Sequence, residues 1–104
     1  MKKIYLFSYL ILFFSNSLIA QADSVMKLGL EVYNNKAQCG VCHILQTAGS
    51  EGQIGPNLDQ LKPQEGQIIS VVTNGIGVMP AFEGTLTDEE IEAVAYYVSK
   101  STNK

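Results

Sequence analysis

The sequence predicts an all-α fold: one small domain of three to four short helices and long loops. Three observations lead to this prediction. Apolar residues between positions 24 and 36 recur at the spacing of one helical face, and a capping box at Thr87 opens a second helical pattern. Glycine and proline interrupt the stretches between, and no segment alternates with the period of a strand. A chain of 104 residues has room for a single domain.

The first residues have the pattern of a secretory signal peptide. Two lysines at positions 2 and 3 precede the apolar run 4–14, and Ala20-Gln21-Ala22 is a small-residue cleavage site. The run is shorter than the ~18 residues a spanning helix needs. We predict that residues 1–22 are cleaved, leaving residues 23–104 as a periplasmic domain with no stable insertion in the membrane.

The predicted mature domain is acidic. Removal of residues 1–22 leaves five lysines against ten carboxylates, a formal net charge of −5, and the chain has no arginine. Such a surface repels nucleic acids and anionic membranes, so we expect no nucleic-acid partner. A domain this short usually depends on a covalent or metal staple.

The first helix is expected at about residues 24–36, with Ser24 as its N-cap. Its apolar face is formed by Val25, Leu28, Val32 and Tyr33. Gly29 lies on the same face, where glycine costs ~1 kcal/mol relative to alanine. This suggests that another helix crosses at Gly29.

Two further helices are separated from it and from each other by loops. Residues 44–61 are rich in turn signals and predict a long loop. Pro63 fits the first turn of a helix that stops at Asn74-Gly75. The apolar stretch 76–82, broken by glycine and proline, predicts a buried or half-buried loop. The last helix begins with Thr87-Asp88-Glu89-Glu90, whose acids favour the positive end of the helix dipole.

The chemistry of the chain concentrates at Cys39-Gly40-Val41-Cys42-His43, which contains both cysteines and the single histidine. A C-x-x-C-H run can bind one haem through two thioether bonds and supply an imidazole to the iron. Three other uses of these residues are possible. A redox-active thiol pair requires a βαβ frame, a zinc site requires four ligands, and a plain disulfide leaves His43 unexplained.

A second iron ligand would come from Met26 or Met79. Met26 lies in the amphipathic first helix, where packing is the usual role of methionine. Met79 lies in the loop 76–82, which can bring a thioether to a haem face, and Pro80 restricts the backbone beside it. We therefore predict His43 and Met79 as the iron ligands, a recurrent pairing.

In this order and spacing, the motifs resemble those of small bacterial class I cytochromes c, including the c6-like and c551/c555-like carriers. The resemblance covers nearly all of residues 23–104 and rests on four pieces of sequence. These are Cys39 to His43, Gly55-Pro56-Asn57-Leu58, Asn74-Gly75 through Met79-Pro80-Ala81-Phe82, and Leu86-Thr87 to Tyr97-Val98.

This resemblance implies one haem c, attached through Cys39 and Cys42 and ligated by His43 and Met79. It also implies that the Pro56 carbonyl accepts a hydrogen bond from the other nitrogen of His43, and that Leu58 belongs to the cofactor-binding set. The family's terminal helices cross at a glycine, so Gly29 and Tyr33 should pack against Val94 and Tyr97. Tyr96 should then be a surface residue.

An iron with both axial positions filled by protein has no site for substrate, so we expect an electron carrier and not an enzyme. Its partners would be periplasmic redox proteins: a dehydrogenase as donor, and an oxidase or another cytochrome as acceptor. The uncharged segments 39–44 and 76–82 predict an apolar docking patch at the haem edge.

Two alternative functions remain open at this point. One is a dedicated cytochrome subunit of a periplasmic dehydrogenase, such as sulfite dehydrogenase. The other is a peroxidase-like haem enzyme or ligand sensor in which Met79 is labile.

Overall fold

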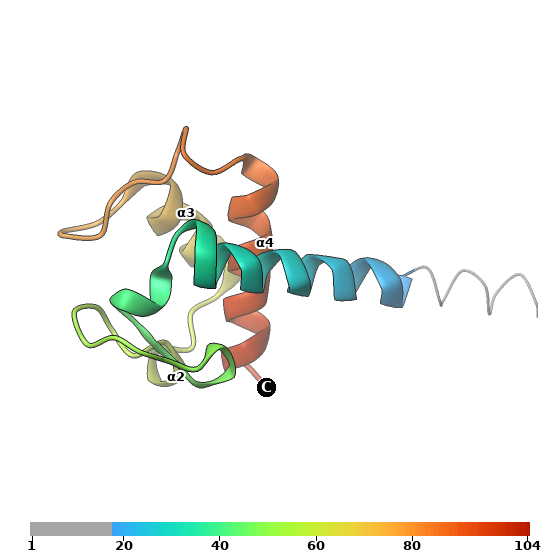
Figure 1. Ribbon diagram of the computed structural model, residues 1–104, viewed down its shortest axis with the longest axis horizontal. Helices are drawn as coiled ribbons and strands as arrows, with labels where there is room; N and C mark the ends of the chain where they lie inside the picture. Colours follow the sequence, from blue (N-terminus) through green and yellow to red (C-terminus); the bar gives the residue numbers. More distant parts are fainter. Residues whose placement is uncertain (1–17) are drawn as a thin grey trace, which may run out of the picture.

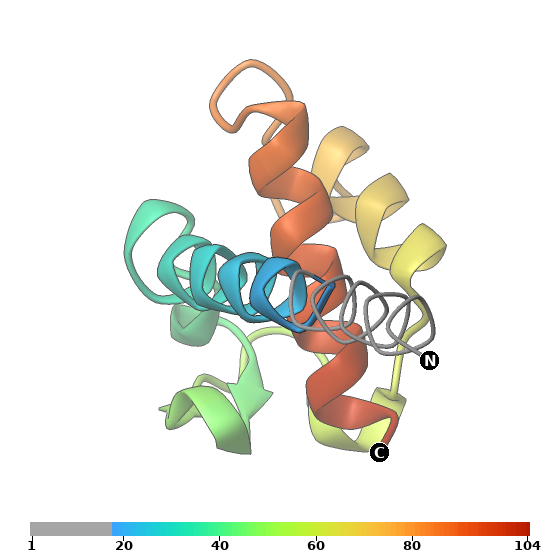
Figure 2. The same cartoon turned by 90° about the vertical axis from the view of Figure 1, so that its right-hand side faces the viewer.

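The computed structural model describes residues 18–104, which form a mostly helical fold, as predicted (Figure 1). The N-terminal helix, whose described part is 18–31, crosses in front of α4 (Asp88–Thr102), and the two views show the crossing to be steep (Figures 1 and 2). The helix α3 (Glu65–Asn74) packs alongside α4. The all-α prediction is confirmed.

The N-terminal helix begins earlier than the sequence predicted. Residues 18–31 are helical and continue into the π-helical turn η1 (Val32–Lys36). Ser24 is therefore not an N-cap: its Oγ donates to the Ala20 carbonyl at 3.0 Å, one turn back inside the helix. The predicted end is confirmed, since the Ala37 N–H closes the last turn on the Val32 carbonyl at 2.8 Å.

The apolar run 4–14 of the predicted signal peptide lies outside the described residues. Among residues 18–104, no helix is both long enough and apolar enough to cross a membrane.

Gly29 lies at the helix crossing, as predicted. A Cβ atom at this position would collide with the Ala93 carbonyl and with Cβ of Tyr97. One turn further along, the rings of Tyr33 and Tyr97 are tilted by 59° with centroids 6.1 Å apart. The predicted contact with Tyr97 is confirmed, the Ala93 carbonyl is a further close neighbour of Gly29, and Tyr33 and Val94 belong to the same core cluster.

The prediction of a surface Tyr96 is only partly right. Its side chain is half-buried. The Lys100 ammonium lies 5.5 Å from the centre of the Tyr96 ring, within range of a cation–π contact.

The predicted capping of α4 is present in full. Thr87 Oγ1 accepts the Glu90 N–H at 3.1 Å, and Glu90 Oε1 accepts the Thr87 N–H at 2.9 Å. At the end of α3, the Gly75 N–H bonds to the Val71 carbonyl, which confirms the predicted stop. Pro63 lies two residues before α3 and not in its first turn.

The segment 44–61, predicted as a long loop, holds four short elements. The strands β1 (Ile44–Leu45) and β2 (Ser50–Glu51) pair antiparallel, and the 3₁₀ turn η3 (Gln46–Ala48) joins them. Asn57 then caps the single-turn helix α2 (Leu58–Leu61). Strands of two residues are too short to give an alternating pattern, so the sequence could not reveal them.

The loop 76–82 is mostly exposed, whereas the sequence predicted a buried or half-buried loop. Ile76 and Met79 exchange both main-chain hydrogen bonds, at 3.1 and 2.9 Å, which makes a tight turn. The turn projects Ile76 and Val78 into solvent, with exposures of 66% and 87%, whereas Met79 and Phe82 stay half-buried.

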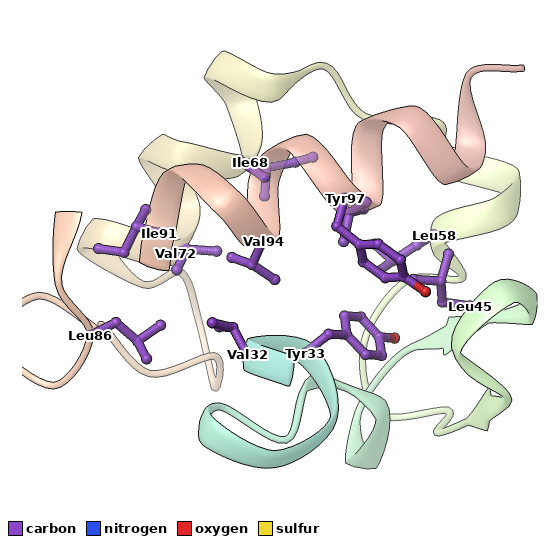
Figure 3. Packing of buried hydrophobic residues seen from close by; sticks show 12 residues of the cluster. Val32, Tyr33, Leu45, Leu58, Ile68, Val72, Leu86, Ile91, Val94 and Tyr97 are labelled. Carbon is purple, nitrogen blue, oxygen red and sulfur yellow. The ribbon is translucent and has the colours of Figure 1, made fainter. Parts of the chain in front are cut away.

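The core lies between the N-terminal helix, α3 and α4 (Figure 3). Tyr33 and Tyr97 lie side by side near Leu45 and Leu58. Val32 lies between Tyr33 and Leu86, on the side of Val72 and Val94. The core residues that come from the loop segments, Leu45, Leu58 and Leu86, tie those segments to the helices.

Candidate functional site: a haem cleft

The C-x-x-C-H run forms one compact turn. It contains the 3₁₀ helix η2 (Cys39–Val41), and the Cys39 carbonyl accepts the N–H groups of Cys42 and His43 at 3.1 and 3.0 Å. Gln38 enters the turn with a left-handed backbone, φ 52°. The thiols of Cys39 and Cys42 are both free.

The ring of His43 is held by a main-chain acceptor. Its Nδ1 lies 2.7 Å from the Pro56 carbonyl oxygen. A carbonyl only accepts, so Nδ1 carries the proton and donates it. The lone pair of the neutral ring is then on Nε2, which is the arrangement a metal-ligating histidine needs.

Gly55 allows this approach of Pro56 to His43. A Cβ at Gly55 would lie 2.5 Å from Cε1 of the ring. The Gly55 N–H donates to the Cys42 carbonyl at 2.7 Å and ties the two segments together. The Gly-Pro pair is therefore more than a turn: it is the support against which His43 is fixed.

Met79 reaches the same site from the loop 76–82. Its loop is tied back to α3 by the Phe82 N–H, which donates to the Val72 carbonyl at 2.8 Å. The turn at residues 76–79 leaves Met79 half-buried against the core while its neighbours face solvent.

Two adjoining cavities, of about 240 and about 500 Å³, lie between these segments. Ligand pockets in proteins typically measure ~300–1,000 Å³. Four predicted site residues line both cavities: Cys39, His43, Pro56 and Met79. Leu58 lines only the inner cavity and Cys42 only the outer one. The fold thus brings all six predicted residues to one cleft.

The inner cavity has several lining residues that the sequence did not single out. Most come from α3 and α4, and they are Gln67, Ile68, Val71, Val72, Val94 and Val98, together with Tyr33. On α3 the spacing 67, 68, 71, 72 is that of one helical face, so periodicity could have identified this wall. Nothing in the sequence marked Tyr33 as both a core residue and a cleft residue.

The Cys39 thiol lacks the environment of a redox-active cysteine. Burial raises the pKa of the Cys39 thiol to about 11, so it stays protonated at neutral pH. The turn is followed by the two-residue strand β1 and not by the βαβ frame of a thioredoxin-like motif.

The residues around the cleft fit a covalently bound haem. Two thiols, an imidazole with its Nε2 free and a thioether border the same space, and the remaining walls are mainly apolar. These are the groups through which haem c bonds to a protein. Two cysteine sulfurs form thioether bonds to the porphyrin, and a nitrogen and a sulfur ligate the iron.

Known proteins resemble this chain over most of its length. A family model described as cytochrome c oxidase, cbb3-type, subunit III matches residues 25–98. Cytochrome c6 of Leptolyngbya boryana is 39% identical over 85 residues, which are 73% of this chain and 92% of that protein.

Two further relatives come from other bacteria. The cytochrome c subunit of 4-cresol dehydrogenase from Pseudomonas putida is 37% identical over 81 residues, covering 77% of this chain and 66% of that protein. The crystal structure of the c-type cytochrome SorU from Sinorhizobium meliloti has a TM-score of 0.74 and 49% identity, and the match covers 79% of this chain and 95% of that one.

Proposed function

This chain belongs to the small class I c-type cytochromes, and on that premise we propose that it is a periplasmic electron carrier whose iron is held by His43 and Met79. The family model that it matches is described as cytochrome c oxidase, cbb3-type, subunit III. It is an electron-transfer protein and not an enzyme, and it carries one haem c attached through Cys39 and Cys42. When bound, haem c supplies an iron that changes between the ferric and ferrous states by one electron.

The single observation that carries this proposal is the joint position of His43 and Met79. Both side chains border the same two cavities, together with the Cys39 thiol. His43 presents Nε2 because Pro56 holds Nδ1 at 2.7 Å. A thioether as second ligand favours the reduced form and raises the potential. If His43 and Met79 both hold the iron, no position on it would be left for substrate.

The other residues of the cleft exclude water and orient the ligands. Leu58 is buried in the inner cavity wall, and Pro56 fixes the plane of the imidazole through its carbonyl. An apolar wall around a redox centre keeps the local dielectric low and so contributes to its potential.

We assign docking to a haem-edge patch that consists of Val41, Ile54, Ile76 and Val78. These four residues line the outer cavity and are 63%, 68%, 66% and 87% exposed. The patch carries no charge, and transient redox complexes use small interfaces of this kind. Ile54 adds to the two segments from which the sequence predicted the patch. The acidic remainder of the domain would give a modest preference for basic partners.

Export to the periplasm is part of the same proposal. It rests on the pattern of residues 1–22, and cleavage after Ala22 would leave the cleft residues untouched, since the first of them is Tyr33.

One relative favours a second candidate function. The 4-cresol dehydrogenase cytochrome c subunit is, by its name, part of an enzyme. By analogy, this chain would be the dedicated cytochrome subunit of a periplasmic dehydrogenase, with sulfite dehydrogenase as one possibility. Affinity purification from the native periplasm separates the two: a stoichiometric catalytic subunit indicates the dedicated role, and a free monomer indicates the carrier.

Expression with the bacterial haem-attachment machinery tests the proposal directly. The exported protein should be heavier than its polypeptide by one haem, and Cys39→Ser and Cys42→Ser should each remove one thioether bond. The ferric wild type should show the weak sulfur–iron charge-transfer band, which Met79→Ala should abolish. Rapid binding of carbon monoxide by the reduced wild type at neutral pH would instead indicate a labile Met79 and a ligand-binding function.

A further inference from the structure

The hydroxyl of Ser50 lies at the back of the C-x-x-C-H turn and makes three close contacts. Its Oγ lies 2.9 Å from the His43 carbonyl, 3.0 Å from the Leu45 amide nitrogen and 2.8 Å from the Tyr33 hydroxyl. Its Cβ lies 2.6 Å from the place a Cβ on Gly40 would occupy. Ser50 is thus packed against two residues of the C-x-x-C-H turn, Gly40 and His43.

The number of available protons fixes the direction of these bonds. A serine hydroxyl has one proton and two acceptor lone pairs. The Leu45 N–H can only donate and the His43 carbonyl can only accept, so the Ser50 proton goes to His43. Tyr33 must then donate to Ser50, since its own distance to the His43 carbonyl is 3.5 Å. The result is one chain of hydrogen bonds, from Tyr33 through Ser50 to His43.

We propose that Ser50, oriented by Tyr33, is a positioning residue for the axial histidine; this rests on the proposed ligation of the iron by His43. The Pro56 carbonyl holds the ring of His43, and Ser50 holds its main chain from the opposite end. The direction in which Nε2 points depends on both anchors, because a rotated peptide would move the ring even with its Nδ1 bond intact.

The burial of this network makes it rigid. Tyr33 is fully buried and its ring lines the inner cavity, while Ser50 is half-buried. A buried hydroxyl that loses its partner is destabilising, so the arrangement resists alternatives in which either group points elsewhere. The pairing of β1 with β2 keeps Ser50 opposite Leu45.

The chain supplies a matched control in the second tyrosine of the core. Thr47 Oγ1 lies 3.0 Å from the Tyr97 hydroxyl, and neither group has a hydrogen bond to the haem-binding turn. Ser50→Ala and Thr47→Val each take a hydroxyl partner from a core tyrosine. Only Ser50→Ala also releases the His43 carbonyl.

The experiment compares the haem-loaded wild type with Ser50→Ala, Tyr33→Phe and Thr47→Val. The ferric electron paramagnetic resonance spectrum reports the orientation of the axial imidazole, and the midpoint potential reports its bond to iron. Ser50→Ala should broaden or split the low-spin signal and shift the potential. Tyr33→Phe should give a smaller change of the same kind, and Thr47→Val should match the wild type. Amide exchange at Leu45 should rise roughly two- to tenfold in Ser50→Ala, the effect of one lost hydrogen bond.

Two results would overturn the role of Ser50. One is a Ser50→Ala protein with the wild-type spectrum and potential. The other is a Thr47→Val protein altered as much as Ser50→Ala, which would indicate general loosening of the core. If Ser50→Ala does not load haem, Tyr33→Phe decides by the same criteria. A wild type that binds no haem would instead overturn the proposed function itself.

Discussion

Gly29 meets Tyr97 where the N-terminal helix crosses α4, and the crossing has no room for a Cβ atom on Gly29. Helix propensity favours alanine over glycine by ~1 kcal/mol, whereas overpacking a closed contact costs ~1–3 kcal/mol. The opposing atoms are the Ala93 carbonyl and Cβ of Tyr97, which can retreat only if α4 moves. Packing should therefore outweigh propensity.

We predict that Gly29→Ala lowers the free energy of unfolding by about 1–2 kcal/mol, measured by urea denaturation of the haem-loaded protein. Gly66→Ala in α3 is the matched control, because nothing lies within 4 Å of a Cβ there. It should be neutral or stabilising by up to ~1 kcal/mol. A Gly29→Ala protein as stable as Gly66→Ala would contradict the close crossing.

Gly55→Ala should disturb the histidine side of the site. The new Cβ would lie 2.5 Å from Cε1 of His43, so the ring or the Pro56 segment has to move. We expect a weakened Nδ1 bond to the Pro56 carbonyl and a shifted midpoint potential, measured by spectroelectrochemistry. The Gly66→Ala protein should keep the wild-type potential. An unchanged potential in Gly55→Ala would show that the support behind His43 is not tight.

Val78→Glu tests the haem-edge patch. Val78 is 87% exposed, so the substitution places a charge on the patch with little effect on folding. We expect slower electron transfer to a cytochrome or oxidase partner, by roughly tenfold, measured by stopped-flow absorbance. Ser70→Glu, an exposed change on α3 outside both cavities, should leave the rate close to wild type. Equal effects of the two changes would point to net charge and not to the patch.

The ion pair of Lys36 with Glu90 should give stability a defined pH dependence. Hydrogen bonds from the Lys36 ammonium and the Thr87 N–H hold the pKa of Glu90 below its usual value. The same Glu90 bond and charge, with a smaller effect of Glu31, raise the pKa of Lys36. The contribution of Glu90 is complete above its unfolded pKa of ~4.3 and is lost as the pH falls through the lower folded value. The contribution of Lys36 is complete below ~10.4 and is lost as the pH rises through the raised folded value.

We therefore predict that Glu90→Gln is destabilising at neutral pH and that the difference from wild type disappears in acid. Gln can still serve in the capping box, so the change isolates the charge. A double-mutant cycle with Lys36→Met should give a coupling energy at neutral pH that vanishes at both extremes and shrinks with added salt. A coupling energy independent of pH would contradict the ionic origin.

The sequence by itself determined the features that are local along the chain. The five residues of the C-x-x-C-H run are enough to predict the cofactor, because two sulfurs and an imidazole at that spacing suit haem c. The capping box at Thr87 and the stop at Gly75 were predicted correctly since they depend on neighbours one turn away. Met79 could be predicted as an iron ligand from its place in the loop 76–82, but the role of Gly55-Pro56 could be assigned only through the resemblance to a known family.

The tertiary structure alone decided what depends on residues far apart in sequence. It brings Cys39, His43 and Met79 to one cleft, turns Val78 outward beside a half-buried Met79, and sets the Ser50 hydroxyl against the His43 carbonyl. It also extends the first helix back beyond Ser24, against the expected cap. Local propensities differ by ~1 kcal/mol or less, and a buried contact or hydrogen bond is worth as much, so packing across the fold settles what neighbouring residues leave open.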